Sequence, residues 1–151
     1  MSIIILLDSG PLGLITNSGS SSAERRECNS WLEGLVFQGV SIKVPEIADY
    51  EVRRELLRAD KIEGIKRLDN FKARVGYVPL TTQTMLKAAE FWAQIRKQGM
   101  QTAHDKALDG DVILAAQATM LKHDGYDVII ATTNVNHLSR LANAKAWRDI
   151  P

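Results

Sequence analysis

The chain is poor in features that would staple a small protein or attach it to a membrane. It has one cysteine, Cys28, among 151 residues, so no internal disulfide is possible and a reducing compartment is the natural expectation. The apolar run from Ile3 to Leu7 is too short for a membrane span or a signal-peptide core, and no basic residue precedes it. We therefore expect a cytoplasmic protein with no membrane segment.

The chain also has almost no excess of charge of either sign. Lys and Arg number 19 against 18 Asp and Glu, which leaves a net charge of +1. This balance does not by itself indicate a nucleic-acid binder, although a basic rim around an acidic centre is compatible with it. Hydrophobic residues at 45% and charged residues at 25% are ordinary for a globular protein. The length fits a single domain, residues 1–151, with a sizeable core.

The chain lacks the motifs of several metal-, nucleotide- and phosphate-dependent protein classes. His104, His123 and His137 fit no zinc-binding spacing, and one cysteine is too few for such a site. No Gly-x-x-x-x-Gly-Lys-Ser/Thr loop is present, which excludes a P-loop NTPase. The segment that starts at Asp8 lacks the Asp-x-Asp of haloacid-dehalogenase phosphatases, and no paired acid of the receiver type precedes it.

Strand and helix patterns alternate along the chain. Runs that are apolar throughout, such as Ile3–Leu7, indicate strands buried on both faces of a parallel sheet. Trp31 and Trp92 have helical core spacing, and we expect both to be buried. Strands are expected at 3–7, 40–44 and 127–131, an extended piece at 77–80, an edge strand at 144–147, helices at about 23–38, 45–59, 62–75, 81–99, 109–123 and 137–141, a loop at 16–22 and an irregular segment at 100–108.

This alternation predicts an α/β fold, with a central parallel sheet flanked by helices. In such sheets the functional crevice lies outside the carboxyl ends of the strands. Asp8 ends the first strand, and Asn134 follows the strand that begins at Asp127. Asp109 and Asp111 open a helix whose N-terminus is expected at the same edge. Structural explanations stay open, because Asp8 suits a turn and Asp109 suits a helix N-cap.

Glu51 lies on the apolar face of the helix expected at 45–59. Ala48, Val52 and Leu56 share that face with it, at helical spacing. A carboxylate beside a buried stripe is costly unless a metal or an arginine satisfies it. A position at the edge of the stripe, reaching solvent, is the open alternative. Glu46, one turn earlier, is a second candidate that looks more like a first-turn acid favoured by the helix dipole.

Convergence of Asp8, Glu51 and Asp111 would create an all-oxygen site for a hard cation. Mg²⁺ is held in proteins by a few carboxylates, waters and substrate phosphate. Without a cation, such carboxylates would repel one another. A site of this kind catalyses phosphodiester hydrolysis, because the metal lowers the pKa of a bound water and neutralises charge in the transition state.

The ordered set of motifs resembles the PIN domain family, in particular its VapC-like members. An acid follows the first aliphatic strand, and another acid lies in the helix after the second strand. The segment from Asp109 to Ala118 resembles the family's Asp-x-Asp-x-x-Ile-Ala-Ala-x-Ala block. The segment from Val128 to Asn134, with the four residues after it, resembles the family's final strand-and-turn block. The resemblance extends over nearly the whole chain.

The resemblance implies a Rossmann-like parallel sheet and a ribonuclease that depends on Mg²⁺ or Mn²⁺. Many bacterial members are toxins of type II toxin–antitoxin pairs, which implies an RNA substrate, a cognate antitoxin and a homodimer. By position, Asp8, Glu51 and Asp111 match the metal-binding acids, and Asp109 matches a frequent neighbouring acid. Asn134 stands where many members have Asp. It cannot add negative charge, which leaves a second metal in doubt.

Arginines around Glu51 are candidates for RNA contacts, with solvated helix faces as the alternative. Arg53 and Arg54 adjoin Glu51, and Arg25 and Arg26 open another helix. A rival hypothesis is a PIN-like fold that does not cut and serves as an RNA- or protein-binding module. The missing fourth acid and the small net charge favour this rival, whereas the three intact acids argue against it.

Overall fold

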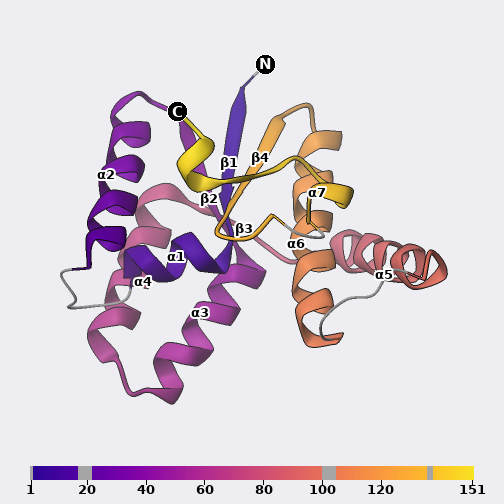
Figure 1. Ribbon diagram of the computed structural model, residues 1–151, viewed down its shortest axis with the longest axis horizontal. Coiled ribbons are helices and arrows are strands. Elements are labelled where there is room, and N and C mark those ends of the chain that lie inside the picture. Colours follow the sequence, from indigo (N-terminus) through magenta and orange to yellow (C-terminus); the bar gives the residue numbers. More distant parts are fainter. Residues whose placement is uncertain (1, 17–21, 100–104, 136–137) are drawn as a thin grey trace.

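Five parallel strands form the centre of the protein. The computed structural model describes residues 2–16, 22–99, 105–135 and 138–151. In this part of the chain the strand order is β3-β2-β1-β4-β5 (Figure 1). β1 lies in the middle, where Ile5 is opposite Ile42 of β2 and Ile129 of β4. The strands are β1 (Ile3–Leu7), β2 (Ser41–Pro45), β3 (Tyr77–Val78), β4 (Asp127–Thr132) and β5 (Ala144–Ala146).

Helices cover both faces of this sheet (Figure 1). Ile5 and Leu7 of β1 pack in one core cluster with residues of α1, α2 and α4, and Ile4 and Leu6 pack in a second cluster with residues of α6. The α/β prediction and the burial of β1 on both faces are therefore confirmed. The helices are α1 (Ser9–Thr16), α2 (Ala23–Phe37), α3 (Glu46–Arg58), α4 (Ile62–Val75), α5 (Thr82–Lys97), α6 (Asp105–His123) and α7 (Leu138–Leu141), followed by a 3₁₀ helix (Trp147–Asp149).

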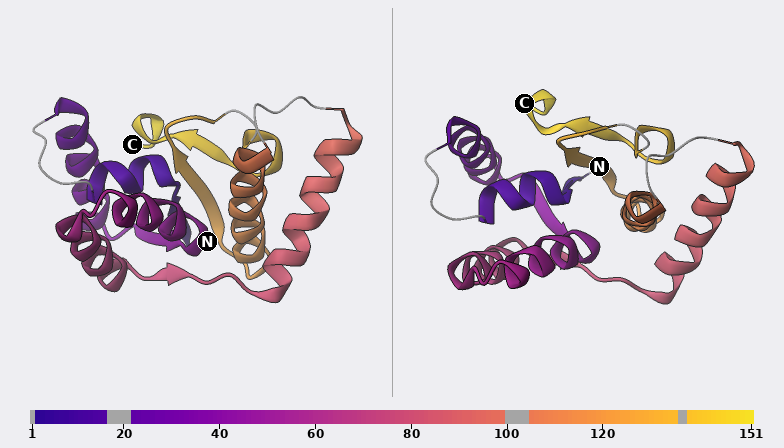
Figure 2. Two further views of the ribbon diagram at one scale, coloured as in Figure 1. Left: turned by 90° about the horizontal axis from the view of Figure 1, so that it is seen from below. Right: turned by 60° about the horizontal axis from the view of Figure 1, so that its bottom comes forward.

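The helix α5 packs on α6 and lies away from the sheet (Figure 2). Ala88 and Ile95 of α5 form a third core cluster with residues of α6. Trp92 is 39% exposed on this outlying helix, so its predicted burial is wrong. Trp31 is partly buried, as predicted, and packs on Trp147 at 5.5 Å between ring centroids. No helix in the described ranges is long and apolar enough to cross a membrane.

The sequence does not predict α1, because the Ser-Gly-Pro that follows Asp8 is typical of a turn. Proline is tolerated in a first helical turn, since the N–H groups there have no partner in the helix. Pro11 lies in that first turn, and the N–H of Leu12 makes the first helical bond to the carbonyl of Asp8 at 3.1 Å. Asp8 therefore precedes a helix instead of an irregular turn.

The helix α6 begins at Asp105, four residues before the predicted start. Asp109 therefore lies in its second turn and is not the N-cap. Leu108, Val112 and Ala116 form one buried stripe against α5, which explains the earlier start. Most of the loop predicted at 16–22, the first part of the irregular segment at 100–108, and His104 and His137 lie outside the described residues.

Candidate metal centre at the carboxyl edge of the sheet

Asp8 stands where β1 ends and α1 begins. Its Oδ1 accepts a hydrogen bond from the Ser9 N–H at 2.7 Å, and its Oδ2 accepts one from the Thr132 hydroxyl at 2.7 Å. Its own N–H donates to the carbonyl of Ala131 at 2.9 Å. Burial raises the pKa of Asp8, and these hydrogen bonds to the carboxyl group oppose the rise. Asp8 is thus oriented by both neighbouring elements, β4 and α1.

Gly10 allows α1 to start directly against the end of β4. A Cβ built on Gly10 would lie 2.5 Å from Oγ1 and 2.7 Å from Cγ2 of Thr133, closer than real Cβ atoms approach other groups. Any larger residue would therefore force α1 away from β4. The glycine keeps Asp8 within reach of the Thr132 hydroxyl.

Glu51 reaches the same edge from α3. Its side chain is partly buried, and its carboxyl group lies over the Cα of Gly110 on α6, where a built Cβ would be 2.7 Å from Glu51 Oε2. Burial and the charges of Asp8 and Asp111 raise the pKa of Glu51 from 4.5 to about 7, and the Arg54 guanidinium opposes the rise. Ionising Glu51 is therefore costly in this environment.

Asp111 is the third carboxyl group, and it comes from α6. Burial raises its pKa from 3.8 to about 6, and the charge of Asp8 adds to the rise. The next residue, Val112, is buried against α5 and fixes the rotation of this turn of α6. The structure thus brings Asp8, Glu51 and Asp111 close enough for their charges to interact, from three separate elements.

The donor set suits a hard divalent cation, which the structure itself does not contain. The three acids offer only oxygen, and a cation among them would relieve the burial and mutual repulsion that raise their pKa values. Within the described residues, no group of three or more His, Cys, Asp or Glu is arranged so that it could hold a metal ion as it stands. The metal therefore stays a prediction, which rests on the chemistry of the three acids.

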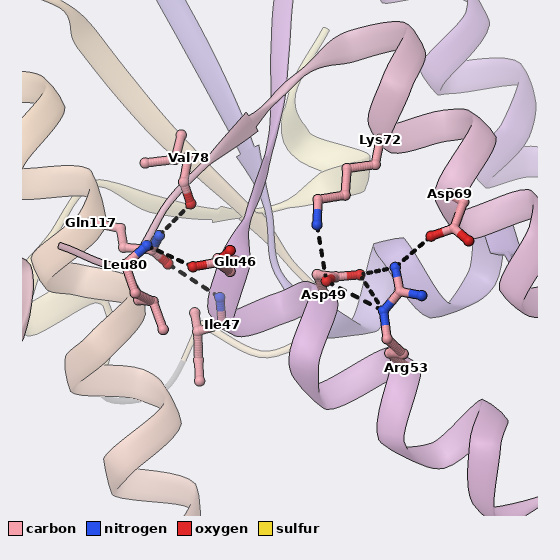
Figure 3. A network of polar contacts seen from close by, with 9 residues as sticks. All are labelled: Glu46, Ile47, Asp49, Arg53, Asp69, Lys72, Val78, Leu80 and Gln117. Atoms are coloured by element: carbon pink, nitrogen blue, oxygen red, sulfur yellow. Dashed lines mark hydrogen bonds and ion pairs between the residues drawn. The ribbon is translucent and has the colours of Figure 1, made fainter.

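Asp109 and Glu46 lie away from the three acids, whereas Asn134 is linked to Asp8 through the Thr132 hydroxyl. Asp109 is exposed and lines a groove between α5 and α6. Asn134 is exposed just after β4, where its N–H donates to the Thr132 hydroxyl oxygen at 3.1 Å. Glu46 accepts a hydrogen bond from the Leu80 N–H at 2.9 Å (Figure 3). Between the two candidate glutamates, the structure places Glu51 beside the other acids and Glu46 beside the β3–α5 connection.

A buried ion-pair network holds α3 against α4 (Figure 3). Asp49 is 7% exposed and pairs with Arg53 at 2.9 Å and with Lys72 of α4 at 3.2 Å. Arg53 also reaches Asp69 of α4 at 2.7 Å. Arg53 was a candidate for an RNA contact, with a solvated helix face as the alternative, but its guanidinium is engaged by these two carboxylates. Its observed role is to join the two helices.

Gln117 fixes α6 to the chain around β3 (Figure 3). Its side chain is fully buried, and its Nε2 donates to the carbonyls of Val78 at 2.7 Å and Pro79 at 3.3 Å. Its Oε1 lies 3.5 Å from the N–H of Ile47 at the start of α3. The helix that carries Asp111 is thereby anchored beside the helix that carries Glu51.

A cavity of about 550 Å³ opens next to Glu51 and extends along α1 and α3. Ser9 and Gly10 form part of its wall near the acids. Its cationic lining residues are Arg25, Arg54, Arg58 and Lys61. Arg58 pairs with Glu55 at 2.7 Å, whereas the Arg54 guanidinium lies 5.0 Å from the centre of the Tyr50 ring. The cavity therefore joins the acidic centre to cationic groups.

Sequence reasoning missed Gly10 and Gly110 as parts of this site. Thr132 closes the strand that begins at Asp127, so the sequence places it at the expected site edge, but its hydrogen bond to Asp8 was not predicted. The register that pairs Leu7 with Ala131 continues to Asp8 and Thr132, so knowledge of the strand order would have revealed the contact. The two glycines act by leaving space, and no local sequence signal marks a space between distant elements.

Comparison with known proteins finds similar structures but no similar sequences among protein families or curated proteins. No protein-family model matches the chain. No curated protein matches it either. The fold is similar to a chain in the crystal structure of VapBC2 from Rickettsia felis bound to a promoter DNA fragment, with a TM-score of 0.72 and 16% identity over 95% of this chain and 98% of that chain. It is also similar to a chain in the crystal structure of FitAcB from Neisseria gonorrhoeae, with a TM-score of 0.61 and 15% identity over 97% of this chain and 99% of that chain.

A third similar chain is that of VapBC-1 from nontypeable Haemophilus influenzae, with a TM-score of 0.64 and 17% identity over 97% of this chain and 99% of that chain. Coverage is nearly complete in both directions in all three comparisons. At such low identities the similarity establishes the fold alone. The chain has the fold seen in these VapBC and FitAcB structures, which confirms the VapC-like PIN fold predicted from the sequence.

Proposed function

We propose that the protein is a metal-dependent endoribonuclease, which hydrolyses phosphodiester bonds of RNA at a Mg²⁺ or Mn²⁺ site formed by Asp8, Glu51 and Asp111. The observation that carries this proposal is the convergence of these three carboxyl groups at the carboxyl edge of the sheet. The adjoining cavity with cationic lining residues is compatible with a polyanionic substrate.

The residues around the acids have distinct roles in this proposal. A bound cation would activate water and neutralise charge on the phosphate. The Thr132 hydroxyl and the Ser9 N–H orient the Asp8 carboxylate. Arg54 lies beside Glu51 in the cavity wall, from where its guanidinium can bind a substrate phosphate. Asn134, at the end of β4, is proposed to orient a water or phosphate.

We further propose that the protein is the toxin of a type II toxin–antitoxin pair in the cytoplasm. The similarity to VapBC and FitAcB chains supports this role and a cognate antitoxin as partner. A homodimer is part of the same proposal. Co-expression with the product of an adjacent gene tests the pairing: that product is expected to copurify with this chain and to abolish its cleavage of RNA. If no adjacent gene encodes a protein that does both, this part of the proposal is wrong.

The enzymatic proposal is tested by cleavage of structured and single-stranded RNAs with Mg²⁺, Mn²⁺ or EDTA. We expect cleavage with metal, none with EDTA, and at least a hundredfold loss in Asp8→Asn. Glu63→Gln is the control, because Glu63 is exposed on α4, pairs with Lys66 and does not line the cavity beside Glu51. Metal-independent cleavage, or full activity of Asp8→Asn, would overturn the proposal. A folded protein that cuts none of these RNAs would favour the non-cutting binding module.

A further inference from the structure

Gly110 of α6 lies against the Glu51 carboxyl group. The three atoms nearest to a Cβ built on Gly110 all belong to that group: Oε2 at 2.7 Å, Cδ at 3.5 Å and Oε1 at 3.7 Å. The distance to Oε2 is shorter than real Cβ atoms show. A side chain at position 110 and the present position of the Glu51 carboxyl group therefore exclude each other.

The backbone conformation does not require a glycine at position 110. Gly110 lies inside α6 and is not among the described glycines with positive φ. Glycine in a helix interior is less stable than alanine, because it loses more conformational freedom on folding. What glycine provides at this position is space, and the space is filled by the Glu51 carboxyl group.

The helix α6 cannot retreat to make room for a larger residue. Gln117 lies two turns after Gly110 on the same face of α6. Its amide is bound to the carbonyls of Val78 and Pro79 and is fully buried. With α6 held in this way, the end of the flexible Glu51 side chain is what would have to move.

We propose that Gly110 is a positioning residue, whose missing side chain sets where the Glu51 carboxyl group lies relative to Asp8 and Asp111. This inference rests on the proposed function, because it concerns the metal site of that function. Metal–ligand distances in proteins lie within about 0.2 Å of characteristic values, so the positions that the Glu51 carboxyl group can reach matter for binding. A displaced Glu51 therefore weakens metal binding without unfolding the protein.

The test is Gly110→Ala, with three measurements on the full chain. We expect the unfolding midpoint in EDTA to rise by about 1–3 °C, because alanine stabilises the helix. Mn²⁺ affinity, measured by calorimetry, is expected to fall about 10- to 100-fold, the range seen when residues that orient metal ligands are changed. RNA cleavage should fall at a given Mn²⁺ concentration and recover in part at higher Mn²⁺.

Gly34→Ala is the matched control. Gly34 is an exposed glycine inside α2, and nothing lies within 4 Å of a Cβ built on it. This variant should gain similar helix stability and keep the wild-type Mn²⁺ affinity. Unchanged Mn²⁺ affinity in Gly110→Ala would overturn the inference, and so would a lowered unfolding midpoint, which would show that the glycine is needed for the fold.

A double variant tests the contact itself. Glu51→Asp shortens the side chain by one methylene and withdraws it from position 110. We expect the loss of Mn²⁺ affinity in Gly110→Ala/Glu51→Asp to be smaller than the product of the two single losses, since the residues are in contact. A multiplicative loss would count against the contact.

The two proposals fail in different ways. If the wild type binds Mn²⁺ and Asp8→Asn abolishes binding while Gly110→Ala leaves it unchanged, only the positioning role is lost. If the wild type binds no Mn²⁺, both proposals fall together.

Discussion

At the scale of single residues, the carboxyl groups of Glu51 and Asp111 carry an electrostatic cost in the metal-free protein. Their pKa values rise from 4.5 to about 7 and from 3.8 to about 6. The folded protein therefore holds these protons more tightly than the unfolded chain does. The resulting stabilisation is complete below about pH 4 and is lost as the pH rises through about 6 to 7.

We expect Glu51→Gln to remove part of this pH dependence. The amide does not titrate, so in EDTA the variant should be more stable than the wild type at pH 8, by about 1–3 kcal/mol after allowance for partial exposure. Urea unfolding between pH 4.5 and 8 measures the effect. Glu90→Gln, an exposed position on α5, should keep the wild-type slope. Equal slopes for Glu51→Gln and the wild type would contradict the assignment of the cost to Glu51.

The sequence was sufficient to select three acids that the structure brings near one another, but not the residues that arrange them. Asp8 and Glu51 were predictable because each stands in an informative local context, the end of an apolar strand and a buried helix face. Thr132 and Gly110 act through contacts with residues more than fifty positions away. Such contacts depend on strand order and helix packing, which local patterns do not encode.

At the scale of elements, the position of α3 depends on ion pairs with α4. Asp49 is buried between Arg53 and Lys72, so its carboxylate offsets two partly buried positive charges. Removing a carboxylate from such a pair leaves those charges without compensation. Since α3 also carries Glu51, this network supports the site from a distance.

We expect Asp49→Asn to lower the free energy of unfolding by about 1–3 kcal/mol, because partial exposure of the two cations moderates the cost. The comparison is Asp69→Asn, whose side chain is 57% exposed and bonds the same Arg53. That change should cost less than about 1 kcal/mol. Urea unfolding of the two variants decides the matter, and a larger effect at Asp69 would refute the assigned importance of Asp49.

The elements themselves were largely predictable, with two exceptions. The strands β1 and β4 are apolar runs bounded by polar residues, and such runs are distinctive. The helix α1 contains Ser, Gly and Pro, which also form turns, and only its packing on the sheet decides between the two structures. The start of α6 was misplaced because the acids at 109 and 111 suggested an N-cap, although Leu108 already belonged to the buried stripe.

At the scale of the whole molecule, metal binding should appear as thermal stability. A ligand that binds only the folded state at a hundred times its dissociation constant adds about 2.7 kcal/mol, or about 5–10 °C in the unfolding midpoint for a chain of this size. We expect Mn²⁺ to produce such a rise in the wild type and not in Asp8→Asn. Glu90→Gln, on exposed α5, should respond like the wild type. A rise of equal size in Asp8→Asn would indicate that Mn²⁺ binds elsewhere.

The place of β1 in the middle of the sheet has a consequence for synthesis on the ribosome. β1 is made long before its partner β4, which begins only at Asp127. A nascent chain that stops before β4 lacks the strand that carries Thr132 and leaves one edge of β1 unpaired. Pairing over so long a separation is slow, since a large loop must close first. The acidic centre is therefore completed only once β4 has been translated, long after β1.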